Sequence, residues 1–154
     1  MRLNGVQRLL ETGLIISTFS AIFILCALVS FHPADPSWSQ TGEFLHVKNI
    51  TGSTGAWIAD ILLFSFGWLA FFIPVAIQAF GYIFFKKPHK ILQLDYLTLG
   101  LRVVGLVFFV TTAAAISSIN FDDIFYFPSG GVVGDVIANA MMPAFNFTGT
   151  SIFL

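Results

Sequence analysis

The sequence predicts an all-α integral membrane protein, a polytopic helical bundle with three full spans, an interfacial helix and the start of a fourth span. Apolar runs occupy residues 13–31, 61–85 and 97–119, and each is long enough to cross about 30 Å of hydrocarbon as a helix. Of the 154 residues, 56% are hydrophobic and 10% are charged, against about 25% charged in soluble domains. We therefore expect the chain to contact the lipid bilayer rather than fold in water.

The first run, residues 13–31, follows two arginines and could be mistaken for a secretory signal. Its apolar stretch is longer than the usual 7–15 residues of a signal core, and Leu28-Val29-Ser30 is a poor small-x-small cleavage site. We expect a retained span. Cys26 lies inside it and is expected to be a small apolar filler.

The second run, residues 61–85, follows a predicted external loop at residues 32–54. Ser53 or Thr54 is expected to cap the second helix, and Asp60 would then lie in its first turns, where the helix dipole favours an anion. Pro74 falls in the middle of the run and predicts a kink there.

The third run, residues 97–119, is followed by a predicted external loop at residues 120–131 and by an ambiguous tail. Residues 131–143 are apolar but contain Asp135, Asn139 and Pro143, and an Asp near mid-bilayer costs about 2.5–3.5 kcal/mol. We expect an interfacial helix here, begun by Ser129 and the following glycine pair. A fourth span is expected to begin at about residue 150 and to be incomplete at Leu154.

The basic residues alternate between sides of the predicted bundle. Six of them lie on one side, if the Arg102 side chain extends back to that side of the membrane: Arg2, Arg8, Lys86, Lys87, Lys90 and Arg102. The 32–54 loop on the other side carries Lys48 alone. The positive-inside rule therefore places the N-terminus and the Lys86–Tyr96 loop in the cytoplasm. The loops at 32–54 and 120–131 would lie outside it.

Signs of chemistry are weak. No ionisable residue lies centrally in a predicted span, where catalytic or transport groups would be expected, so we predict no catalytic residue, no cofactor and no enzyme activity. His32 and His46 share a loop with Asp35 and Glu43, but solvated loop residues explain them better than a metal site. The net charge of −1 gives no basic field for nucleic acid.

An alternative hypothesis is a small polytopic transporter or channel subunit, with Pro74 and Gln78 on the pathway. A helix-to-helix hydrogen bond explains Gln78 more simply. Small residues recur every four positions at Gly13, Ser17 and Ala21 in the first span. The third span repeats this spacing at Thr111 with Ala115 and at Ala113 with Ser117. Such ridges let helices approach closely, and they fit packing within the chain and homo-oligomerisation equally well. A freestanding membrane scaffold is a further possibility.

Four ordered motifs show a specific resemblance. They are Ser30–Thr41 (SFHPADPSWSQT), Gly55–Asp60 (GAWIAD), Asn120–Phe127 (NFDDIFYF) and Ser129–Gly134 (SGGVVG). Together they resemble the membrane domain of the FtsK/SpoIIIE family of bacterial DNA translocases, in its gammaproteobacterial form. The resemblance runs in consistent order over almost the entire chain.

The resemblance implies four spans with both termini cytoplasmic, followed by a linker and a hexameric motor that uses ATP and Mg²⁺ to pump DNA. This sequence ends before the fourth span is complete, so no motor residue can be carried over. The implied location is the bacterial inner membrane at the division septum. The implied partners are other membrane proteins of the division machinery, in coordination of cell division with chromosome segregation.

Candidate partner-binding residues lie in the two external loops: Asp35, Trp38, Asp122, Asp123 and Tyr126. Partners outside the cytoplasm could reach such acidic and aromatic side chains. The alternative is structural: a turn at Asp35-Pro36, a tryptophan at the bilayer interface and aspartates at a helix end.

Overall fold

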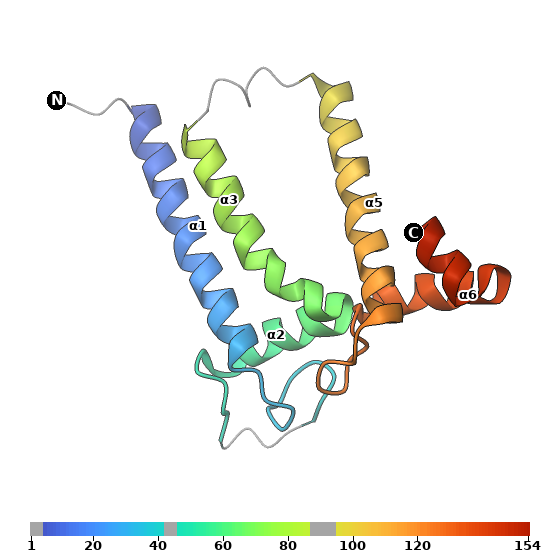
Figure 1. The fold of residues 1–154 in the computed structure, drawn as a ribbon. Helices are drawn as coiled ribbons and strands as arrows, with labels where there is room; N and C mark the ends of the chain where they lie inside the picture. The colour runs from blue at the N-terminus through green and yellow to red at the C-terminus, as the bar shows by residue number, and fades with distance from the viewer. Residues whose placement is uncertain (1–4, 42–45, 87–94) are drawn as a thin grey trace.

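The computed structural model describes residues 5–41, 46–86 and 95–154, and every regular element within them is a helix. In chain order the helices are α1 (Gly5–Val29), α2 (Gly52–Phe66), the short 3₁₀ helix η1 (Gly67–Phe71), α3 (Phe72–Lys86), α5 (Tyr96–Asn120) and α6 (Gly131–Phe153). In Figure 1, α1, α3 and α5 run upright, and α2 and the first part of α6 lie across their lower end. The expected all-helical membrane fold is confirmed.

Three helical stretches of the described chain are long and apolar enough to cross a bilayer: Gln7–Val29, Gly52–Lys86 and Tyr96–Asn120. The third agrees with the expected span at 97–119. The first helix starts at Gly5 rather than at residue 13, because a helix satisfies its backbone internally and can continue past the hydrocarbon into polar sequence.

The second run departs from expectation, because the helix breaks at Gly67 and not at Pro74. Gly67 has a φ of 56°, and a Cβ there would overlap the carbonyl oxygen of Ser129. The chain turns through η1, so α2 lies across the bundle and only α3 continues upward (Figure 1). Pro74 falls in the first turn of α3, where backbone N–H groups have no partner within the helix, so the N–H that proline lacks costs no hydrogen bond. The predicted kink at Pro74 is wrong.

The tail forms α6, which begins at Gly131 directly after the Ser129-Gly130 pair. It continues past the expected end at residue 143 and through Pro143, up to a non-helical residue, Asn146, with φ 55° and ψ 179°. After Asn146 the chain turns upward in Figure 1 as a second helical segment, close to where the fourth span was expected to begin.

The buried core lies at the end of the molecule where α2 and the loops meet. It joins residues of α1, the loop after α1, α2, η1 and the loop after α5: Ala27, Leu28, Phe31, Ala59, Leu63, Ala70, Ile124 and Phe127. By contrast, every residue of α5 from Tyr96 to Phe109 is exposed in the isolated chain. Since these are largely apolar residues, this part of α5 suits contact with lipid.

Two predicted small-residue ridges serve packing within the chain. On α1, Ser17 lies so close to Gly81 of α3 that a Cβ on Gly81 would overlap the Ser17 hydroxyl. On α5, the predicted ridge residues Ala115 and Ser117 are buried, and the Ser117 hydroxyl donates to the carbonyl oxygen of Ser129. Gly13, in contrast, has open space around it.

Candidate functional site

The two loops expected on one side, around residues 32–54 and 120–131, lie together at the lower end of the molecule in Figure 1. Asp60 of α2 holds them to each other. Its carboxylate accepts hydrogen bonds from the backbone N–H of Ser39 at 2.8 Å and from the Ser39 hydroxyl at 2.6 Å. It also accepts one from the Tyr126 hydroxyl at 3.1 Å. Hydrogen bonds to an ionised group are about twice as strong as neutral ones.

Asp60 was expected in the first turns of a helix, stabilised by the helix dipole. It lies instead in the middle of α2, with no exposed surface, and its charge is compensated by donors from two loops. The sequence contained a signal for this role. A carboxylate flanked by apolar residues, here Ala59 and Ile61, must find hydrogen-bond donors or face solvent. Its partners Ser39 and Tyr126 lie 21 and 66 positions away, so no local pattern identifies them.

Asp35 shapes the first loop from within. Its two carboxylate oxygens accept hydrogen bonds from the backbone N–H groups of Lys48 and Asn49, each at 2.8 Å. The Asn49 amide in turn donates to the carbonyl oxygen of Ala27 at 2.8 Å, which ties the loop to the end of α1. With only 2% of its surface exposed, Asp35 supports the loop and does not form part of its outer face.

Aromatic rings fill the space between the loops. The ring of Phe31 lies 5.1 Å from Phe125 and 5.8 Å from Phe127, measured between centroids. The second loop is a tight turn in which Ile124 and Phe127 exchange two backbone hydrogen bonds. The turn forces Phe125 to a φ of 57°. Aromatic pairs of this kind contribute about 0.5–1.5 kcal/mol beyond their burial.

The remaining four predicted partner residues are exposed at this end. Trp38 is 54% exposed, with its ring edge-on to Phe64 at 4.9 Å, and Tyr126 is 41% exposed. The Asp123 carboxylate accepts a hydrogen bond from the backbone N–H of Ser129 at 3.3 Å. The Asp122 carboxylate has no partner among the described residues, although its backbone carbonyl accepts a hydrogen bond from the Trp68 indole at 3.2 Å.

We call these four residues, Trp38, Asp122, Asp123 and Tyr126, the loop face. Only Tyr126 among them is joined to the Asp60 contacts. Its hydroxyl lies near both Asp60 and Ser39. Burial raises the pKa of the Tyr126 hydroxyl above its usual value of 10.0, and the negative charge of Asp60 raises it further.

A second set of contacts fixes the turn into α6. The hydroxyls of Ser117 and Ser129 each donate to the backbone carbonyl of the other, at 3.1 and 2.8 Å. The Ser129 carbonyl also accepts the backbone N–H of Trp68 at 2.9 Å. These contacts join α5, η1 and the start of α6.

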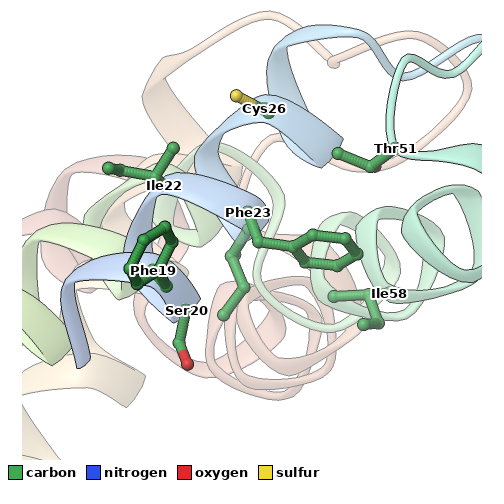
Figure 2. Close-up of a pocket in the computed structure, with 8 residues that line it drawn as sticks. Phe19, Ser20, Ile22, Phe23, Cys26, Thr51 and Ile58 are labelled. Carbon is green, nitrogen blue, oxygen red and sulfur yellow. The ribbon is translucent and has the colours of Figure 1, made fainter. Parts of the chain in front are cut away.

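The described residues contain no group of three or more His, Cys, Asp or Glu side chains that could hold a metal ion. His32 uses its Nδ1 as acceptor for the Ala34 N–H at 3.1 Å, and Glu43 lies outside the described residues. A shallow groove of about 650 Å³ between α1 and α2 includes Cys26, with Phe19, Phe23 and Ile58 (Figure 2). Its walls are almost entirely apolar.

The residues of the alternative transport hypothesis lie in α3. Pro74 is buried in the first turn of α3. The Gln78 side-chain oxygen is buried and accepts no hydrogen bond in the described part of the chain. The helix-to-helix bond expected for Gln78 is therefore not seen within residues 5–41, 46–86 and 95–154.

The chain was compared with known proteins. The model of the 4TM region of the DNA translocases FtsK/SpoIIIE matches residues 6–154. The chain is 47% identical over 152 residues to the DNA translocase FtsK of Shewanella oneidensis. This alignment covers 99% of this chain and 17% of that relative. It is 43% identical over 153 residues to the DNA translocase FtsK of Vibrio vulnificus, again 99% of this chain and 16% of the relative.

No solved structure matches the chain. The chain spans about a sixth of the length of the FtsK relatives that it matches. The similarity includes the helices, both loops and the turn into α6, since the matched region extends from α1 to the last residue. The chain therefore belongs to the family of 4TM regions of the DNA translocases FtsK/SpoIIIE.

Proposed function

We propose that this chain anchors a DNA translocase in the bacterial inner membrane at the division septum and joins it to other division proteins. The family membership supports the anchor, because the matched relatives are DNA translocases of which this region is a small membrane part. The segment itself acts without catalysis. The motor, with its ATP and Mg²⁺, belongs to the rest of such a protein, and this segment contacts lipid and protein partners but no nucleic acid.

The proposed orientation places the N-terminus in the cytoplasm. The ends of α1, α3 and α5 that carry Arg8, Lys86 and Arg102 lie at the same end of the molecule, opposite the loops (Figure 1). Lys86 extends along Tyr82, with its amine 3.2 Å from the phenol oxygen, as expected of a lysine at a membrane boundary. Positive charge favours the cytoplasmic side, so the loop face would be exposed on the other side of the membrane.

The loop face is the proposed contact with division partners, and its construction is the observation that carries this proposal. Asp60 and Asp35 hold the loops from inside the fold, with the Tyr126 hydroxyl as one donor to Asp60, so the indole of Trp38 and the carboxylate of Asp122 are left free of these supporting hydrogen bonds. Trp38, Asp122 and Asp123 are left exposed. Acidic and aromatic side chains on a supported surface suit recognition by another protein.

Septal recruitment of a fluorescent fusion of the full chain tests this role. The double variant Asp122→Asn and Asp123→Asn removes both charges without adding positive charge outside, and we expect weaker recruitment and weaker crosslinking to partners. The charge reversals Asp122→Lys and Asp123→Lys should weaken both further. Asp95→Asn is the matched control, since Asp95 is exposed at the other end of α5. Unchanged recruitment in the double variant, with normal membrane levels, would contradict the role.

The oligomeric state of the anchor follows from the same proposal. A hexameric motor would bring six copies of this segment together, so the chain would form a homo-oligomer when joined to the motor. Crosslinking of the isolated chain and of the full-length protein in membranes separates the two cases. Oligomers in the full-length protein alone would show that the motor, and not this segment, drives assembly.

A further inference from the structure

An apolar cleft lies between α3 and α5, and η1 contacts both helices. The cleft has a volume of about 850 Å³, within the roughly 300–1,000 Å³ of pockets that hold small ligands. Residues lining it include Trp68, Phe72, Ala76, Phe109, Ala113 and Phe121. Its two polar wall groups are already satisfied: the Ser117 hydroxyl donates to Ser129, and the Trp68 indole donates to Asp122.

The cleft continues into the lipid-facing surface of the two spans. Phe72 on one rim is 69% exposed and Phe109 on the other is 71% exposed. An unfilled cleft inside a bilayer would forfeit dispersion contacts along both walls. Hydrocarbon from the surrounding membrane can enter from the side and restore them.

The walls suit flexible acyl chains better than a helix of a second copy. Helices in membranes approach closely through small residues. Here only Ala76 and Ala113 are small, and the other wall residues are aromatic, branched or long, apart from Ser117. The surface is therefore irregular on the scale of a helix, but an acyl chain can adapt to it.

A negatively charged residue, Asp122, lies beside the loop end of the cleft, next to two residues that line it. Trp68 lies there with Phe121, and tryptophan is enriched at the level of the lipid headgroups. Asp122 follows directly, is joined to Trp68 through its backbone, and has an exposed carboxylate without a partner among the described residues. Coulomb attraction at this position favours a headgroup with a positive amine and disfavours an anionic one.

We propose that the α3–α5 cleft binds the acyl chains of a phospholipid whose amine-bearing headgroup pairs with Asp122. The bound lipid completes the wall between the two spans. This inference depends on the membrane fold and shares Asp122 with the loop face; because the lipid titrations use the purified chain without partner proteins, they test it separately from any role at the septum.

Native mass spectrometry of the full chain, released from detergent micelles, tests the site. Phosphatidylethanolamine and phosphatidylglycerol with identical acyl chains are titrated in separate samples. We expect one tightly retained phosphatidylethanolamine in the unmodified chain. Ala76→Phe fills the cleft and should abolish retention, whereas Ala79→Phe, on an exposed alanine of α3 outside the cleft, should leave it unchanged. Equal retention in the two variants would overturn the proposal.

A second measurement does not depend on a variant that fills the cleft. Phosphatidylethanolamine with brominated acyl chains should quench part of the tryptophan fluorescence of the chain after unbound lipid is removed, and Trp68→Phe should remove most of that quenched part. If quenching is the same with and without Trp68, the lipid lies elsewhere. Disulfide-linked dimers through Ala76→Cys in membranes would instead show that a second copy occupies the cleft.

The headgroup contact has its own control. Asp122→Asn should reduce the preference for phosphatidylethanolamine over phosphatidylglycerol by about two- to five-fold, the range expected for one exposed charge pair. Asp95→Asn, at the opposite end of α5, should not change it. A preference for phosphatidylglycerol in the unmodified chain, or one that Asp122→Asn leaves intact, would refute the pairing.

Discussion

The Tyr126 hydroxyl donates a hydrogen bond to the Asp60 carboxylate at 3.1 Å, across 66 positions of the sequence. The same carboxylate oxygen accepts the Ser39 hydroxyl at 2.6 Å. One buried residue of α2 thus joins the loop before α2 to the loop after α5. The loop end of the fold depends on this residue, because both loops otherwise touch mainly through aromatic rings.

Replacing Asp60 should loosen the loop end. All three groups that face the carboxylate are donors, and in Asp60→Asn one of them would meet the amide NH₂, which is itself a donor. Because the site is fully buried, we expect a loss of about 1–3 kcal/mol of stability. Unfolding in micelles, followed by tryptophan fluorescence, measures this loss. Asp95→Asn, at an exposed position, should change stability far less, and equal losses would contradict the role of Asp60.

Tyr126 should make the stability depend on pH at the alkaline end. Its pKa is raised in the folded chain, chiefly by burial and then by Asp60, so the folded state holds the phenol proton more tightly than the unfolded state does. This contribution is fully present below the ordinary pKa of 10.0 and is lost as pH rises through the higher folded value. Melting temperatures measured from pH 8 to 11 should fall more steeply for the unmodified chain than for Tyr126→Phe. Parallel curves would show that other groups cause the alkaline loss.

The spans were predictable because lipid imposes one requirement on every residue of a span. A helix must satisfy its own backbone and expose apolar side chains for about 20 residues, and that leaves a pattern readable in a short window. For the same reason α5, at Tyr96–Asn120, follows the expected third span to within one residue at each end. Two spans separate the loop at 32–54 from the loop at 120–131, so the chain crosses the bilayer twice between them and both loops lie on the same side.

The break at Gly67 and the role of Asp60 were not predictable in this way. Each depends on a residue far along the chain, Ser129 for Gly67 and Tyr126 for Asp60. Pro74 was the stronger local signal for a kink, yet a proline in the first turn of a helix is readily accommodated. The exposed residues of the loops were only partly predictable. Asp35 is an acidic loop residue like Asp122 and Asp123, but its carboxylate is buried.

The bend between α2 and α3 should be sensitive to a single methyl group. Ala at Gly67 or at Gly131 would need a positive φ, at 56° or 63°, and its Cβ would overlap backbone atoms of Ser129 or Ser65. Strain at such φ values costs about 1–3 kcal/mol per site, before any cost of the overlap. Gly100→Ala and Gly105→Ala are the matched controls, since both glycines are helical with open space around them. These should raise stability by about 0.5–1 kcal/mol.

If Gly67→Ala melts like Gly100→Ala, the bend is not fixed by Gly67. Circular dichroism at equal concentration distinguishes a loosened bend from loss of helix. The helical signal should remain in Gly67→Ala, because α2 and α3 are each formed within their own segments.

The close contact between α1 and α3 should show coupling between Ser17 and Gly81. A Cβ on Gly81 would overlap the hydroxyl of Ser17, whose Oγ is directed to the Leu14 carbonyl at 2.9 Å. Gly81→Ala should therefore separate the helices and destabilise the chain, whereas Gly13→Ala, which meets open space, should not. Ser17→Gly, which removes the obstructing group, should recover most of the loss, so that the double-mutant cycle gives a coupling of about 0.5–3 kcal/mol. Additive effects of the two changes would mean that the helices meet elsewhere, because independent sites show no such coupling.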